Sequence, residues 1–187
     1  QTAEGGWRYT LEDTLAGRAD TSVTLFMGMA LLAADGARIP LDGQERVMDR
    51  LATWLRSVTG EDGIVGYLAA GDRNREPRTL TAGALFLEES MGLAAPLRAR
   101  QAAIVRHEVE NPAGSARRNG LLRFYASLAF RLRGSKILPA FAPQLLMEQR
   151  EDGSWDSSTD RHAAHGGDGF LTALNVLTLT TSYRWPS

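Results

Sequence analysis

Two kinds of apolar segment alternate along the chain, and their periodicity predicts helices. In residues 44–58 (QERVMDRLATWLRSV), the side chains of Val47, Leu51, Trp54 and Val58 fall on one face while charged side chains fall on the other. This spacing is typical of an amphipathic helix at the surface of a domain. Residues 96–110 and 142–149 carry weaker versions of the same pattern, and Pro96 suits a first helical turn.

The second kind of segment is apolar on all sides and contains threonine, except at 121–130, where Ser and Tyr take the place of the threonines. It occurs as DTSVTLFMGMALL at 20–32, RTLTAGALFLEES at 78–90, LLRFYASLAF at 121–130 and FLTALNVLTLTT at 170–181. These runs exceed the usual length of a strand, which favours helices in spite of their β-branched residues. A helix without a polar face should be surrounded by protein, so we expect these four helices to form an inner layer with the amphipathic helices outside it.

Glycine-containing turns precede the apolar segments: EGGWRY at 4–9, EDGIVGY at 61–67, ENPAGSARRNG at 110–120 and EDGSW at 151–155. Thr21 follows Trp7 by 14 positions and Thr81 follows Tyr67 by 14, whereas Thr172 follows Trp155 by 17. The similarity indicates a structural repeat of a turn and two helices, with the indole of each Gly-Trp turn packed between successive repeats.

The first turn is itself a repeat of the last, because QTAEGGW at 1–7 has the spacing of QREDGSW at 149–155. Gln149 should close an outer helix, so Gln1 occupies the place of a helix end whose helix is absent. We therefore expect residues 1–187 to form a single repeat domain, the C-terminal fragment of a longer chain whose other repeats or domains are its partners.

Composition narrows the classes of function. The 187 residues are 43% hydrophobic with a formal net charge of −1, which does not favour nucleic acid as a partner. All basic residues except Lys136 are arginine. The chain has no cysteine, which excludes disulfides and thiolate zinc sites and leaves the compartment open. The longest apolar stretches are much shorter than the approximately 20 residues of a membrane span, so no transmembrane segment is expected.

Several stretches resemble the prenyltransferase and squalene-oxidase repeat proteins, in particular an uncharacterised bacterial branch of that family. They are GGWRYT, ADTSVTLFMGMALLAADGARIP, WLRSV, GIVGY, LTAGALFL and the C-terminal QREDGSWDSSTDRHAAHGGDGFLTALNVLTLTTSYRWP. The resemblance covers nearly the whole chain. It implies an all-α fold, an α/α toroid similar to that of terpenoid cyclases, here a partial ring of about four helical hairpins.

The chain lacks the catalytic motifs of the two best-known activities of this family. Class II terpene cyclases use an Asp-x-Asp-Asp motif, and Asp20 stands here without such a cluster. Protein prenyltransferases bind zinc through Asp, Cys and His, and the chain lacks Cys. We therefore expect a non-catalytic binding domain that holds a small molecule or peptide at the concave end of the toroid. The alternative is an enzyme on the same fold, either a terpene-cyclase-like lyase or isomerase or a polysaccharide lyase. No cofactor and no metal ligand are assigned.

The candidate catalytic residues are acids and histidines. Asp20 precedes an apolar helix, where its carboxylate is expected to cap the first turn or, alternatively, to act as a lone acid at the mouth of the ring. The loop WDSSTDRHAAHGGDG places Asp160, His162 and His165 close together, which suits a structural or solvent-exposed turn, a metal site or acid–base chemistry.

The candidate ligand-binding residues lie mainly on the apolar helices. The threonines have two open interpretations, a polar lining of the lumen or bonding to helix carbonyls. The arginines and the tyrosine are candidates for gripping an anionic ligand or for packing between repeats. These candidates are Thr21, Arg78, Thr81, Arg123, Tyr125, Arg161 and Thr172.

Overall fold

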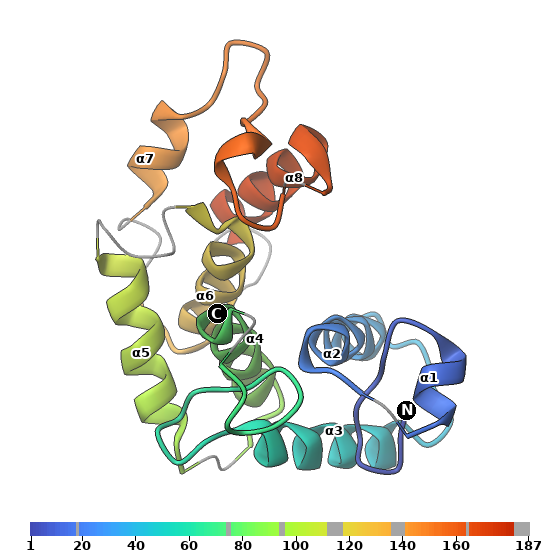
Figure 1. Ribbon diagram of the computed structural model, residues 1–187. Helices are drawn as coiled ribbons and strands as arrows, with labels where there is room; N and C mark the ends of the chain where they lie inside the picture. The colour runs from blue at the N-terminus through green and yellow to red at the C-terminus, as the bar shows by residue number, and fades with distance from the viewer. Residues whose placement is uncertain are drawn as a thin grey trace. The chain divides into compact units, whose positions relative to one another are not determined.

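The structure is a computed structural model that describes residues 1–17, 19–73, 76–93, 96–111, 118–135, 141–163 and 165–181. Within these ranges the fold is all-α, which confirms the all-α part of the prediction, and the only β features are two isolated bridges. The helices are labelled in Figure 1. They are α1 (Leu11–Leu15), α2 (Thr21–Gly36), α3 (Gln44–Val58), α4 (Pro77–Ser90), α5 (Arg98–Glu110), α6 (Gly120–Leu132), α7 (Ala142–Met147) and α8 (Gly167–Leu179).

The chain divides into two compact units, Gln1–Gln101 and Ala102–Ser187. The first unit contains α1 to α4 and the first residues of α5, and the second contains the rest of α5 and α6 to α8. This division does not test the expectation of a single repeat domain. In the described part of the chain, no helix combines the length and the hydropathy needed to cross a bilayer.

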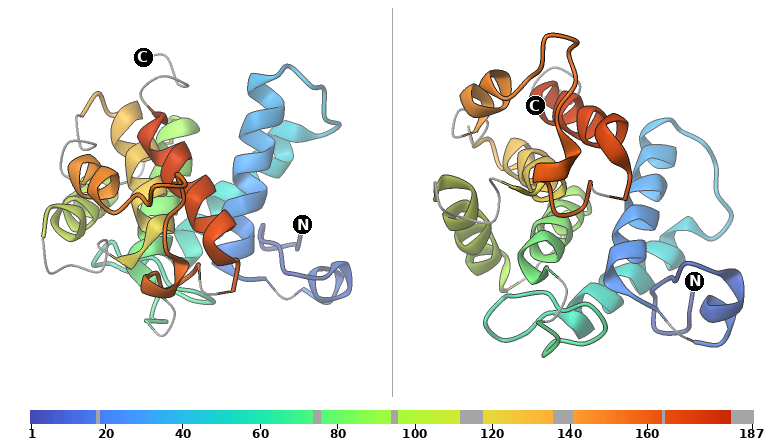
Figure 2. Two further views of the ribbon diagram at one scale, coloured as in Figure 1. Left: turned by 90° about the horizontal axis from the view of Figure 1, so that it is seen from above. Right: turned by 45° about the horizontal axis from the view of Figure 1, so that its top comes forward.

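Helix α3 has the bounds that its amphipathic pattern predicts. Leu51, Trp54, Leu55 and Val58 are buried and the charged face is outward. The helix packs against α2, to which the loop at 37–43 joins it (Figure 2). Helix α5 begins at Arg98, so Pro96 lies in the preceding turn and not in the first helical turn as predicted.

Helices α2 and α4, two of the apolar segments, pack directly on each other. Gly28 allows this close approach, because a Cβ atom there would lie 2.6 Å from Cδ1 of Leu87 and 3.1 Å from Cδ2 of Leu51. Both leucines are completely buried and have little room to move. The packing of α2 on α4 therefore depends on a glycine at position 28.

The expectation that α2 is surrounded by protein is wrong. Its buried face consists of Thr21, Thr24, Leu25 and Gly28, whereas 49% of Phe26 is exposed. The threonines are buried because their hydroxyls bond to backbone atoms, so polar residues occupy the packed side of the helix. Hydropathy alone could not identify this face, because the buried stripe is no more apolar than the exposed one.

Three of the glycine turns are attached to an apolar helix by the same kind of hydrogen bond. In each, a threonine hydroxyl near the start of the helix accepts a bond from a backbone N–H of the turn. The bonds run from Trp7 to Thr24 at 2.9 Å, from Val65 to Thr81 at 3.0 Å and from Trp155 to Thr172 at 3.2 Å.

These bonds correct the register that the sequence suggests. The N–H of Trp7 donates to the hydroxyl of Thr24 and not to that of Thr21, and Thr81 accepts its bond from Val65 and not from Tyr67. Thr21 has a different function, since its hydroxyl donates to the carbonyls of Gly66 and Tyr67 in the next turn along the chain. The predicted alignment failed because it matched aromatic side chains, whereas the shared contact is made by the backbone.

The first and last turns also agree in detail. The Gln1 amide donates to the carbonyl of Gly5 at 2.9 Å, and the Gln149 amide donates to the carbonyl of Gly153 at 2.9 Å. Gly5 and Gly153 have φ values of 100° and 84°, a left-handed conformation that favours glycine. The segments QTAEGGW at 1–7 and QREDGSW at 149–155 thus form the same local turn structure.

In the second unit, α6 packs along α8. Trp155 is buried with Ala163 and Leu171, and its indole N–H donates to the carbonyl of Leu145 at 2.8 Å. The indole therefore joins the turn before α8 to helix α7, which is a structural role of the kind expected for a Gly-Trp turn.

Candidate ligand-binding cavity

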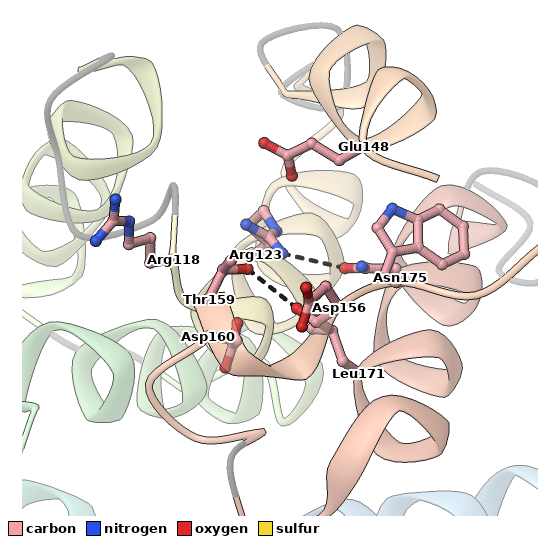
Figure 3. A pocket seen from close by; sticks show the side chains of 9 residues that line it. Arg118, Arg123, Glu148, Asp156, Thr159, Asp160, Leu171 and Asn175 are labelled. Carbon is pink, nitrogen blue, oxygen red and sulfur yellow. Dashed lines mark hydrogen bonds between the residues drawn. The ribbon is translucent and has the colours of Figure 1, made fainter. Parts of the chain in front are cut away.

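The second unit contains a cavity of about 270 Å³ beside the start of α6 (Figure 3). Side chains from α6, from α8 and from the segment between α7 and α8 converge on it. They are Arg118, Arg123, Glu148, Trp155, Asp156, Thr159, Asp160, Leu171 and Asn175. Five of these nine side chains are charged, two of them positive and three negative. The cavity therefore suits a polar ligand and not a purely apolar one.

Arg123 forms the floor of the cavity from α6. It lies four residues after the helix N-cap Asn119, the same place that Thr24 occupies after the N-cap Asp20 of α2. The side chain is 4% exposed, and burial lowers the pKa of its guanidinium, a shift opposed by the negative charges of Asp160 and Glu148. An arginine thus stands in α6 at the position where α2 has threonine.

Asn175 faces Arg123 from α8. Its Oδ1 accepts a bond from Nη2 of Arg123 at 3.2 Å, and Figure 3 shows the two side chains meeting across the cavity. Asn175 is completely buried, and its Nδ2 has no hydrogen-bond partner among the described residues. A buried amide without an acceptor costs about 1–3 kcal/mol, so the floor presents an unused donor at appreciable cost.

Asp160 forms one wall and also holds two segments together. Its Oδ2 accepts a bond from the N–H of Gly120 at 2.6 Å, and its Oδ1 accepts bonds from the N–H groups of His162 and Ala163. The carboxylate therefore caps the first residue of α6 from a distant loop. Three backbone donors already bond to its oxygens, which is the arrangement of a structural cap.

Arg150 organises the rim on the side of α8. It pairs with Asp156 at 3.1 Å and with Asp168 at 2.6 Å. Asp168 also accepts bonds from the N–H and hydroxyl of Ser157, and these bonds together with Arg150 lower the pKa of Asp168 to about 2. The rim loop is thus held in one position by side chains that remain ionised near neutral pH.

The candidate residues of the first unit do not form a common site with one another. Asp20 caps α2 through a bond from the N–H of Val23, which confirms the predicted cap; its Oδ2 is buried without a partner in the described part of the chain. Thr21 and Thr81 bond to backbone groups, the second of the two interpretations that the sequence left open. Arg78 is exposed in the first turn of α4.

Among the candidates of the second unit, only Arg123 and Asp160 line the cavity. Tyr125 belongs to the core, where burial raises the pKa of its hydroxyl. Thr172 is half-buried at its turn, and Arg161 and His165 are exposed. His162 is half-buried, and its Nε2 has no partner among the described residues.

Sequence reasoning left several cavity residues out of its candidates. Arg118 lies in an arginine-rich stretch and Asp156 in the aspartate-rich loop, so each carried some signal. Asn175, a polar residue in an apolar helix, shared with the threonines the interpretation of a polar lining of the lumen. Glu148 and Thr159 carried none, because only the folding of the segment between α7 and α8 brings them to the start of α6.

Comparisons with known proteins assign neither a family nor a ligand to this cavity. No family model, no curated protein and no solved structure matches the chain. Among the described residues, no three His, Asp or Glu side chains gather in a way that could hold a metal ion.

Proposed function

We propose that the chain is a non-catalytic binding module and that its ligand occupies the cavity of the second unit. One observation carries this proposal: the Nδ2 donor of Asn175, buried beside Arg123 at the floor of the cavity, has no acceptor among the described residues. A ligand oxygen at that place supplies the missing acceptor. This gain in free energy favours the bound state without any chemical step.

The ligand is a small polar molecule that carries both oxygen acceptors and donor groups. Asn175 provides a donor for a carboxylate or hydroxyl oxygen, the exposed guanidinium of Arg118 provides further donors at the opposite side of the cavity (Figure 3), and the Glu148 carboxylate provides acceptors. Leu171 and the buried indole of Trp155 supply the apolar part of the wall. A uronic acid or an amino acid has this distribution of groups.

We further propose that the module is a partial α/α toroid of the prenyltransferase and squalene-oxidase repeat type, part of a longer bacterial protein. Three observations support this: the shared bonds of the three turns, the alternation of apolar and amphipathic segments, and the packing of successive apolar helices within each unit. The other repeats or domains of the parent chain are its proposed partners.

An enzyme on the same fold is less well supported. A terpene-cyclase-like reaction needs an acid above an apolar chamber, but the cavity has five charged side chains and Asp160 is occupied by backbone donors. A polysaccharide lyase would need arginine and aspartate side chains in an open groove, and Arg118 and Asp156 both line this cavity. Binding of an oligouronate followed by cleavage would therefore favour the lyase over the module.

The test is a thermal-shift screen of the chain with amino acids, uronic acids, oligouronates and isoprenoid alcohols. A ligand at about one hundred times its Kd stabilises the folded state by about 2.7 kcal/mol, which is easily measured as a rise in Tm. Arg118→Gln should remove most of that rise, whereas Arg161→Gln, which changes an exposed arginine outside the cavity, should retain it. Equal loss in both variants, or stabilisation only by isoprenoids, would contradict the proposal.

A further inference from the structure

The first unit has a groove of about 490 Å³ formed by the ends of three helices. The last turn of α2, the first turns of α3 and the C-terminal end of α4 each contribute to it. Its lining residues are Leu32, Asp35, Gln44, Glu45, Met48, Asp49, Ser90, Met91 and Leu93. The floor is therefore leucine and methionine, and the charged lining is entirely acidic.

The three carboxylates of the groove are not neutralised by the protein. Asp35, Glu45 and Asp49 are exposed, and none of them forms an ion pair in the described part of the chain. Asp35 accepts one neutral bond, from the amide of Gln44 at 2.8 Å. Arg38 and Arg46 are close in sequence, but neither lines the groove.

The helix ends add to this negative potential. Helices α2 and α4 both direct their C-terminal ends at the groove, and neither has a basic residue in its last turn. A helix C-terminus carries a partial negative charge, which lysine or arginine normally compensates. Asp35 stands near the end of α2 instead, whereas Glu89 near the end of α4 pairs with Arg98 at 3.4 Å, so the acid that adds to the negative potential of these ends is Asp35.

The loop that joins two lining residues of the groove also exposes apolar side chains. The loop between Asp35 and Gln44 exposes 54% of Ile39 and 39% of Leu41. Methionine side chains adapt to varied partners, and an apolar floor beside acidic groups matches the two faces of a basic amphipathic helix. The surface is more extended than a single small cation requires.

We infer that this groove, which we call the acidic groove, binds a basic amphipathic helix of a partner protein. Leucine-like side chains of the partner pack on Met48, Met91 and Leu32, and its lysine or arginine side chains meet the three carboxylates. The cations also compensate the C-terminal ends of α2 and α4. This surface is separate from the cavity of the second unit, so its occupation does not depend on the ligand proposed there.

The probe is a capped peptide of about 14 residues, four helical turns, with leucine at i, i+3, i+4 and i+7 and lysine elsewhere. Its binding to the whole chain is followed by fluorescence anisotropy. The variant Asp35→Asn/Glu45→Gln/Asp49→Asn should weaken binding about tenfold or more and reduce its dependence on salt. The variant Met48→Gln/Met91→Gln should weaken it as well, without changing the salt dependence.

The matched control is Glu4→Gln/Glu12→Gln/Glu61→Gln. It alters the charge by the same amount at exposed acids outside the groove, and Glu12, like Glu45, lies in a first helical turn. This variant should bind the probe as the unaltered chain does. Equal weakening in both triple variants, equal binding of a peptide with scrambled leucine positions, or displacement of the probe by lysine amide alone would overturn the inference. Melting temperatures of all variants confirm that they are folded.

Discussion

Glu88 is a buried acid that neither proposed site uses. It lies on α4 at 4% exposure, and burial raises the pKa of its carboxyl to about 7, against the opposing effects of Gln101 and of the charge of Arg98. The Gln101 side chain is completely buried beside it, and neither of its amide atoms reaches a full hydrogen bond with a described partner. Together with Arg56 and Thr59 they line a cavity of about 80 Å³.

This residue predicts a pH-dependent stability. The folded protein holds the proton of Glu88 up to about pH 7, whereas an unfolded glutamate releases it near 4.5. The raised pKa of Glu88 therefore adds to the free energy of unfolding in full below pH 4.5, and this addition is lost as the pH rises to about 7. In urea unfolding, Glu88→Gln should become more stable relative to the unaltered chain by on the order of 2 kcal/mol between pH 4.5 and 8. Glu61→Gln, at an exposed acid, should show no such trend; a parallel trend in both variants would contradict this explanation.

At the scale of elements, threonine hydroxyls attach the glycine turns to the helices that follow them. Thr81 is completely buried, accepts the N–H of buried Val65, and donates to the carbonyl of Pro77 at 2.7 Å. Thr24 accepts the N–H of Trp7 and donates to the carbonyl of Asp20 in the same way. In each turn, the threonine hydroxyl thus accepts a hydrogen bond from a backbone N–H that makes no bond to a neighbouring strand.

Replacing this hydroxyl by a methyl group tests its contribution. Thr81→Val keeps the shape of the side chain but leaves the N–H of Val65 without an acceptor, which should lower the free energy of unfolding by about 1–3 kcal/mol. Thr53→Val, on the exposed side of α3, provides the control and should change stability by no more than about 0.5 kcal/mol. Equal effects at the two positions in denaturant titrations would show that the turn contact contributes nothing.

The elements were largely predictable from the sequence, whereas their faces and register were not. The bounds of α3 follow from its amphipathic period, since its buried residues are apolar and its exposed residues charged or polar. Helix α2 gave no such contrast, because buried Thr21 and Thr24 are polar and exposed Phe26 is apolar. The short helix α1, Leu11–Leu15, was missed because five residues are too few to show a period.

At the scale of the whole molecule, the candidate site was predictable only in part. Arg123 was identified because it lies in its apolar segment at an offset similar to those of the other candidates, and Asp160 because it stands in an aspartate-rich loop. Their common cavity could not be predicted, since it requires that the segment carrying Glu148 fold back over the start of α6. Such a long-range arrangement has no periodic signal in the residues that make it.

The proposed function depends most on a polar ligand that supplies the acceptor missing at Nδ2 of Asn175. Side-chain amide signals in a two-dimensional ¹⁵N–¹H NMR spectrum report on this directly, and the pair that disappears in Asn175→Leu assigns them. During titration with the uronic or amino acid that gives the largest rise in Tm, the Asn175 amide signals should shift progressively to saturation. Saturable shifts elsewhere in the spectrum, with the Asn175 signals unchanged, would contradict the proposed function.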